Sequence, residues 1–183
     1  RRANPEPTRG PAGPYELRDH TADVAVEATA PTLSAVFAAV ADGLTAASCE
    51  SVPETGGERF GLDETAESRE ALLFEYLDRL IYERDVRLVL PADHDCRVIP
   101  PDDANAATDA DTTANPDAAT AADTTAAADT TTAGGGPTWT VEASARAVPL
   151  ADVAAREVKA VTYSEMALER RGAGWYAYVV FDV

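Results

Sequence analysis

The spacing of apolar residues in two segments limits the fold more than any other feature of this sequence. After Pro31 and Thr32, apolar side chains recur at the i, i+3, i+4 and i+7 intervals of one helical stripe, and residues 68–84 repeat the pattern. The stripes consist of Leu33, Val36, Phe37, Val40 and Leu44 in the first segment and of Leu72, Leu73, Tyr76, Leu77, Leu80 and Ile81 in the second. Each predicted helix must bury its stripe against another layer of structure.

Shorter segments with the composition or alternation of strands surround the two helices. The clearest is GWYAYVVFDV at the end of the sequence, in which two different sets of side chains alternate. The other predicted strands cover residues 15–18, 23–29, 58–62, 86–90, 95–99 and 139–148. We therefore expect an α+β fold, with two amphipathic helices packed on one face of a mostly antiparallel six- or seven-stranded sheet. The aromatic and β-branched content of the last strand suits a central position.

One segment does not fit any packed layer. Residues 101–137 contain seven Asp and no basic, aromatic, Leu, Ile, Val or Phe residue, so they cannot bury enough surface to offset the entropy of ordering. We expect a disordered acidic insertion there, within a single domain that spans residues 14–183. The Pro-, Gly- and Arg-rich residues 1–13 are expected to form a disordered tail.

The formal net charge of −17, from 32 acidic and 15 basic residues, restricts the partners of this chain. Nucleic-acid binding needs a basic patch, so we expect no direct stable binding to nucleic acid. The charge has two interpretations, an acidic disordered segment or adaptation to high salt, where screening makes an acidic surface tolerable. Salt adaptation, as in a halophilic archaeon, is favoured because Lys159 is the only lysine and the other 14 basic residues are arginine. A chain that otherwise avoids lysine has a reason to keep this one.

The hydropathy pattern suggests a cytoplasmic protein. No stretch approaches 18 consecutive apolar residues, and the first residues carry arginines without an apolar signal core. We therefore expect neither a membrane span nor a secretory signal.

The stretch RDHTADVAVE places Asp19, His20 and Asp23 just before a predicted strand. If the last strand pairs beside that strand, the Asp182 side chain and the Val183 terminal carboxylate come within reach of Asp23. Carboxylate oxygens suit hard cations such as Ca²⁺ or Mg²⁺, so one interpretation is a metal pocket. The alternative is that Asp182 lies in solvent, Asp23 caps a turn and His20 is a structural hydrogen-bonding residue. The spacing leaves both open.

Four motifs together resemble the archease family, in order and at the expected spacing apart from the insertion. They are DHTADVAVEA, LLFEYLDRLIYERD, VKAVTY and VVFDV, and the match covers residues 14–100 and 138–183. The resemblance implies an accessory protein of the GTP-dependent RNA ligase that joins tRNA halves. Such a protein promotes guanylylation of the ligase's active-site histidine, allows multiple turnover and broadens nucleotide use. An older description of the family implies a chaperone of a tRNA methyltransferase.

The resemblance also implies a site. The family's metal ligands fall on Asp23, Asp182 and Val183, with Ca²⁺ as the expected cation and Mg²⁺ or Mn²⁺ as alternatives. The family's lysine falls on Lys159, near the metal or the phosphate chemistry of the ligase. The chain departs from the family at Ser164, where the family commonly has histidine, and in the acidic insertion.

The implied role is assistance without catalysis by this chain itself. Lys159, Asp19 and His20 are the candidate assisting residues. A competing hypothesis is a metal-dependent phosphoesterase that uses Asp19 and His20 together with the carboxylates of Asp23 and Asp182. It predicts turnover of a phosphate ester by the isolated protein.

Overall fold

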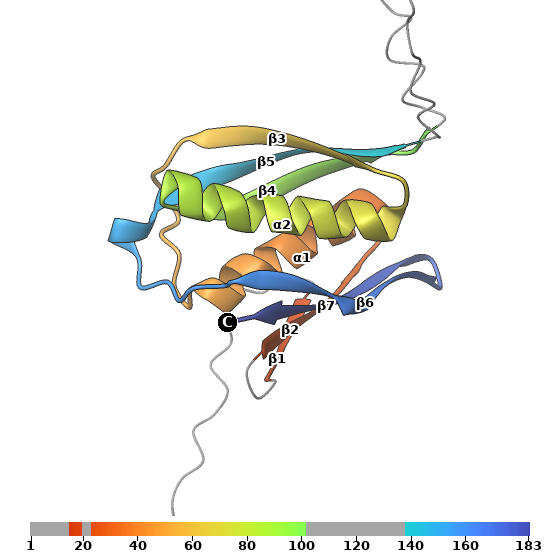
Figure 1. The fold of residues 1–183 in the computed structure, drawn as a ribbon, viewed down its shortest axis with the longest axis horizontal. Coiled ribbons are helices and arrows are strands. Elements are labelled where there is room, and N and C mark those ends of the chain that lie inside the picture. The colour runs from red at the N-terminus through yellow and green to blue at the C-terminus, as the bar shows by residue number, and fades with distance from the viewer. Residues whose placement is uncertain (1–14, 20–22, 102–137) are drawn as a thin grey trace, which may run out of the picture.

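The computed structural model describes residues 15–19, 23–101 and 138–183. Two helices lie between two antiparallel sheets, so these residues form three layers (Figure 1). The tail expected at residues 1–13 lies outside the described residues, and so does the expected insertion apart from residue 101. The expected α+β class is confirmed, with the strands divided between two sheets.

The four-stranded sheet has the order β1-β2-β7-β6 and the three-stranded sheet the order β3-β5-β4, and neighbouring strands are antiparallel in both sheets. The last strand, β7, therefore has a central position, as its composition predicted. The first sheet comprises β1 (Tyr15–Asp19), β2 (Asp23–Ala30), β6 (Ala160–Arg171) and β7 (Gly174–Asp182). The second comprises β3 (Arg59–Ala66), β4 (Val89–Ile99) and β5 (Trp139–Pro149), and a short 3-10 helix (Leu150–Asp152) follows β5.

Helix α1 (Leu33–Ser48) begins where the Thr32 side chain accepts a hydrogen bond from the Ala35 amide at 3.1 Å. Small residues make up much of the helix, and both sheets pack against it. Gly43 is required by this packing, because a Cβ there would lie 2.4 Å from Cγ1 of Val26 in β2. Apart from the half-buried Leu33, the predicted stripe is buried.

Helix α2 (Arg69–Arg87) is capped by Ser68, whose side chain accepts from the Ala71 amide at 3.1 Å. All six apolar residues of its predicted stripe are buried. The helix runs three residues beyond the predicted end at residue 84, because Glu83 pairs with both Arg79 and Arg87 one turn away on each side. Leu88, with a φ of 55°, ends it.

The strands predicted at residues 86–90 and 95–99 are one strand, β4, which begins only at Val89. A register shift between Ala92 and Asp95 interrupts its pairing with β5, and Asp93 adopts a φ of 52°. The bulge turns His94 toward the helices. Its ring contacts side chains of α1 and α2.

Candidate functional site

The two aspartates of the predicted metal pocket lie opposite each other at one end of the four-stranded sheet. In the antiparallel pairing of β2 with β7, Asp23 is the register partner of Asp182. Directly opposed residues of an antiparallel pair project from the same face, with Cβ atoms about 4.5–5.5 Å apart. Both residues are half-buried. The predicted carboxylate site depends on the last strand pairing beside β2, and this pairing is present. It places two negatively charged side chains opposite each other.

Lys159 lies beside this pair. Its main-chain amide donates to the Asp182 carbonyl at 2.8 Å, and its Nζ donates to the main-chain oxygen of Val183 at 3.2 Å. The Lys159 side chain is exposed. The only lysine of the sequence therefore stands at the same strand end as Asp23 and Asp182.

The segment before Lys159 is held against the end of α1. The Arg156 amide donates to the Ser48 carbonyl at 2.7 Å, and its guanidinium Nε donates to the Ala47 carbonyl at 2.5 Å. These carbonyls are among the last of the helix and need partners from outside it, and a cation is favourable at this end of the helix dipole. Val158 is buried in the core between the two anchor points. The end of α1 thereby positions Lys159.

The structure describes less of the two remaining candidate residues, Asp19 and His20. Asp19 ends β1, where its backbone pairs with Val24 of β2, one residue from Asp23. His20 lies outside the residues that the structure describes.

The oxygen atoms at this strand end are suitable ligands for a hard cation. Two carboxylates and one main-chain oxygen are oxygen ligands of the kind that Ca²⁺ and Mg²⁺ take. Two opposed carboxylates also repel, which favours a cation or a hydrogen-bond donor between them. Within residues 15–19, 23–101 and 138–183, no group of three or more His, Cys, Asp or Glu side chains is arranged to hold a metal. The set described here has only two such side chains, so the metal pocket stays a prediction.

A second polar cluster, which sequence reasoning missed, lies between the helices and β4. The Cys96 thiol donates to the Tyr76 hydroxyl at 3.2 Å, and the same hydroxyl lies 3.3 Å from His94 Nδ1. His94 Nε2 lies 3.0 Å from the Thr45 hydroxyl, which donates to the Pro91 carbonyl at 2.7 Å. One assignment of hydrogens satisfies all of these groups, with a neutral His94 that carries its proton on Nε2. Burial lowers the pKa of His94 to about 4, in keeping with that neutral form.

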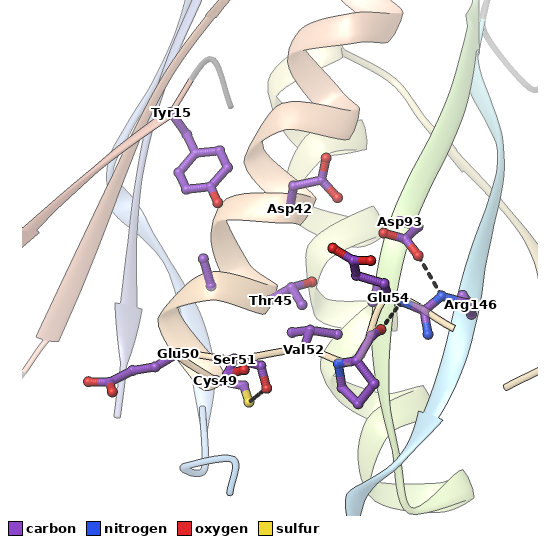
Figure 2. Close-up of a pocket in the computed structure, with 13 residues that line it drawn as sticks. Tyr15, Asp42, Thr45, Cys49, Glu50, Ser51, Val52, Glu54, Asp93 and Arg146 are labelled. Atoms are coloured by element: carbon purple, nitrogen blue, oxygen red, sulfur yellow. Dashed lines mark hydrogen bonds and ion pairs between the residues drawn. The ribbon is translucent and has the colours of Figure 1, made fainter. Parts of the chain in front are cut away.

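The carboxylate of Asp42, on α1, borders this cluster and accepts a hydrogen bond from the His94 amide at 3.2 Å. Burial, together with the nearby charge of Asp93, raises the pKa of Asp42 to about 6. Asp42 also faces a cavity of about 460 Å³ (Figure 2). Strand β1, helix α1, the loop that follows α1, and strands β4 and β5 all contribute to its lining. No local signal in the sequence marks this cavity, because its walls come from five separate segments.

No helix within the described ranges is both long and apolar enough to cross a bilayer.

Comparisons with known proteins agree with the motifs. The model of the archease protein family (MTH1598/TM1083) matches residues 15–183. The solution structure of Methanobacterium thermoautotrophicum protein 1598 is similar, with a TM-score of 0.63 and 20% identity over 93% of this chain and 99% of that one. A crystal structure of an archease from Thermotoga maritima, described as a possible chaperone, aligns with a TM-score of 0.50 and 18% identity over 97% and 99%. No curated protein matches.

Proposed function

Since this chain belongs to the archease family, we propose that it is an accessory activator of the GTP-dependent RNA ligase that joins tRNA halves. In this role it promotes guanylylation of the ligase's active-site histidine, supports multiple turnover and broadens nucleotide use. The ligase carries out the covalent chemistry, and this chain contributes no catalysis of its own.

The observation that carries the proposal is the opposition of Asp23 and Asp182 beside Lys159. In the proposed pocket the two carboxylates and the main-chain oxygen of Val183 hold a divalent cation, with Ca²⁺ expected and Mg²⁺ or Mn²⁺ as alternatives. When bound, the cation supplies positive charge for the phosphate groups of the nucleotide.

Lys159 has a separate task in this proposal. Its exposed ammonium group, next to Val183, is a compact charge on a flexible stem and can reach a phosphate oxygen of a docked partner. The hydrogen bonds that Arg156 makes with the end of α1 limit how far this lysine can move. The chain thus places a cationic group and an anionic pocket at the same strand end.

The net charge of −17 suits a partner whose RNA-binding face is basic. Complementary electrostatic fields speed the encounter of two proteins, although a high salt concentration weakens this effect.

The proposal is tested by multiple-turnover ligation of two RNA halves, one ending in a 3′-phosphate or cyclic phosphate and the other beginning with a 5′-hydroxyl. The cognate ligase is assayed with the wild-type protein, without it, and with Asp182→Ala. Stimulation by the wild type and its loss in Asp182→Ala are expected. Asp63→Asn is the matched control, because it removes an exposed carboxylate from β3 in the other sheet and leaves the pocket intact. No stimulation by the folded wild-type protein contradicts the proposal.

Two other functions give different results in the same set of assays. The Thermotoga maritima relative is described as a possible chaperone, and a methyltransferase chaperone alters site choice by the methyltransferase without affecting ligation. A metal-dependent phosphoesterase hydrolyses a phosphate ester without any partner, and Asp23→Ala abolishes that turnover.

A further inference from the structure

The cavity beside Asp42 is large enough for a small organic molecule. Its volume of about 460 Å³ lies within the roughly 300–1,000 Å³ range of ligand pockets. It opens between β1 of one sheet and β4 of the other, which are the edge strands on the α1 side of the fold. The metal pocket proposed above shares none of its lining residues.

One wall of the cavity carries the carboxylate of Asp42. Asp42 is half-buried on α1 and accepts a hydrogen bond from the His94 amide. Among the described residues, no Lys or Arg forms an ion pair with Asp42. The Tyr15 hydroxyl points toward α1 close to Asp42 (Figure 2), and burial, together with the charge of Asp42, raises the pKa of Tyr15. A cation bound here would relieve the cost of burying this carboxylate.

Arg146 lines the cavity but cannot supply that cation. Its Nε donates to Asp93 at 2.5 Å, and its two other nitrogens donate to the carbonyls of Gly56 at 2.8 Å and Pro53 at 2.7 Å. These bonds leave only 11% of the Arg146 side chain exposed. The guanidinium therefore fastens the loop after α1 to β5 and builds one wall of the cavity (Figure 2).

Apart from Asp42, the lining includes apolar side chains and exposed carboxylates. Ala46, Val52 and Ala92 contribute apolar surface, and Glu50 and Glu54 are exposed at the rim. A half-buried carboxylate, apolar surface and exposed carboxylates in one cavity match a molecule with a cationic group at each end of an aliphatic chain. A single metal ion would leave both the volume and the apolar surface unused.

We propose that this cavity binds a small aliphatic diamine, with one ammonium group at Asp42 and the other at Glu50 or Glu54. The ammonium at Asp42 donates hydrogen bonds to the carboxylate, and the methylene groups contact Val52 and Ala46. The rim carboxylates stay in water and add long-range attraction.

The experiment is a calorimetric titration of the full chain with 1,4-diaminobutane, compared with butylamine and with KCl at matched ionic strength. One binding site and tighter binding of the diamine than of butylamine are expected. Asp42→Asn should weaken binding about tenfold or more, since a hydrogen bond to a charged group contributes about 1.5–3 kcal/mol. NMR should show the pKa of Asp42 falling on binding, because a neighbouring cation favours the carboxylate.

Two further variants separate a specific site from counter-ion attraction to an acidic protein. Ala46→Leu fills the cavity without changing the charge and should also weaken diamine binding. Asp152→Asn removes one exposed carboxylate outside the cavity and should leave binding unchanged. Equal losses in Asp42→Asn and Asp152→Asn, or unchanged binding in a folded Ala46→Leu, would overturn the proposal. Ligase stimulation by these variants is a separate readout, so this proposal and the activator proposal can fail independently.

Discussion

Asp23 of β2 lies directly opposite Asp182 of β7, at one end of the four-stranded sheet. Lys159, the residue before β6, hydrogen-bonds to Asp182 at the same end. Like charges directly opposite each other destabilise a sheet pair, whereas favourable cross-strand pairs contribute about 0.2–1 kcal/mol. The same two residues are the proposed ligands of a divalent cation. Stability and metal binding should therefore respond in opposite directions when one of these carboxylates is neutralised.

We first predict that Asp182→Asn raises the free energy of unfolding by about 0.5 kcal/mol in chelator, because it removes the like-charge repulsion. Saturating Ca²⁺ should then reverse the order of the two proteins. Ligand at 100 times its dissociation constant stabilises the wild type by about 2.7 kcal/mol, whereas the variant has lost a ligand. Thermal unfolding with chelator and with Ca²⁺ measures both effects. An equal response of the two proteins to Ca²⁺ would argue against Asp182 as a metal ligand.

Lys159→Met should abolish stimulation of the ligase while changing the free energy of unfolding by no more than about 0.5 kcal/mol, because the side chain is exposed. Lys159→Arg keeps the positive charge and should retain part of the stimulation. Ligation assays and denaturant unfolding on the same preparations test this prediction. Full stimulation by a folded Lys159→Met protein would remove Lys159 from the proposed mechanism.

The stability of this protein should depend on pH through two groups that act in opposite directions. The pKa of His94 falls from 6.5 to about 4 on folding, so the folded state binds fewer protons and its stability decreases as pH falls through this window. The pKa of Asp42 rises from 3.8 to about 6, so the folded state binds more protons and its stability increases as pH falls from about 6 to 4. The two contributions oppose each other in the wild type.

Single variants should separate these contributions. Relative to the wild type, Asp42→Asn should lose stability between pH 6.5 and 4, by at most about 3 kcal/mol, because only the His94 contribution remains. His94→Gln should gain stability over the same range. Denaturant unfolding at several pH values measures the difference in unfolding free energy between each variant and the wild type. The contributions of the many surface carboxylates cancel in this difference. Equal slopes in the two variants would contradict the assignment of these groups.

The guanidinium of Arg69 lies over two tryptophans from different sheets, 5.7 Å from the ring centroid of Trp139 in β5 and 5.0 Å from that of Trp175 in β7. We predict that Arg69→Ala lowers the free energy of unfolding by about 1–2 kcal/mol, since each cation–π contact contributes about 0.5–1 kcal/mol. Arg97→Ala is the control. Its side chain is 75% exposed and forms an exposed ion pair with Glu142 at 3.5 Å, so the substitution should have a much smaller effect.

Local patterns predicted several parts of this structure because the physics behind them is local. Helical periodicity found the buried stripes of α1 and α2, and alternation found β7, since a side chain's face depends only on its spacing along an element. The bulge at Asp93 was not predictable in this way. It depends on pairing between β4 and β5, whose contacting residues are about 50 positions apart.

Sequence alone determined the buried stripes of the two helices apart from Leu33, the α+β class, the family, and the carboxylate residues that pairing of the last strand brings together. Tertiary structure decided what lies against those residues. Helices that are buried on two sides need two sheets, and periodicity identifies a buried face without identifying its neighbour. The contact between Asp42 and His94 joins residues 52 positions apart, and the cavity walls come from five segments. Such arrangements follow from how the layers pack, because no residue's own sequence neighbours specify them.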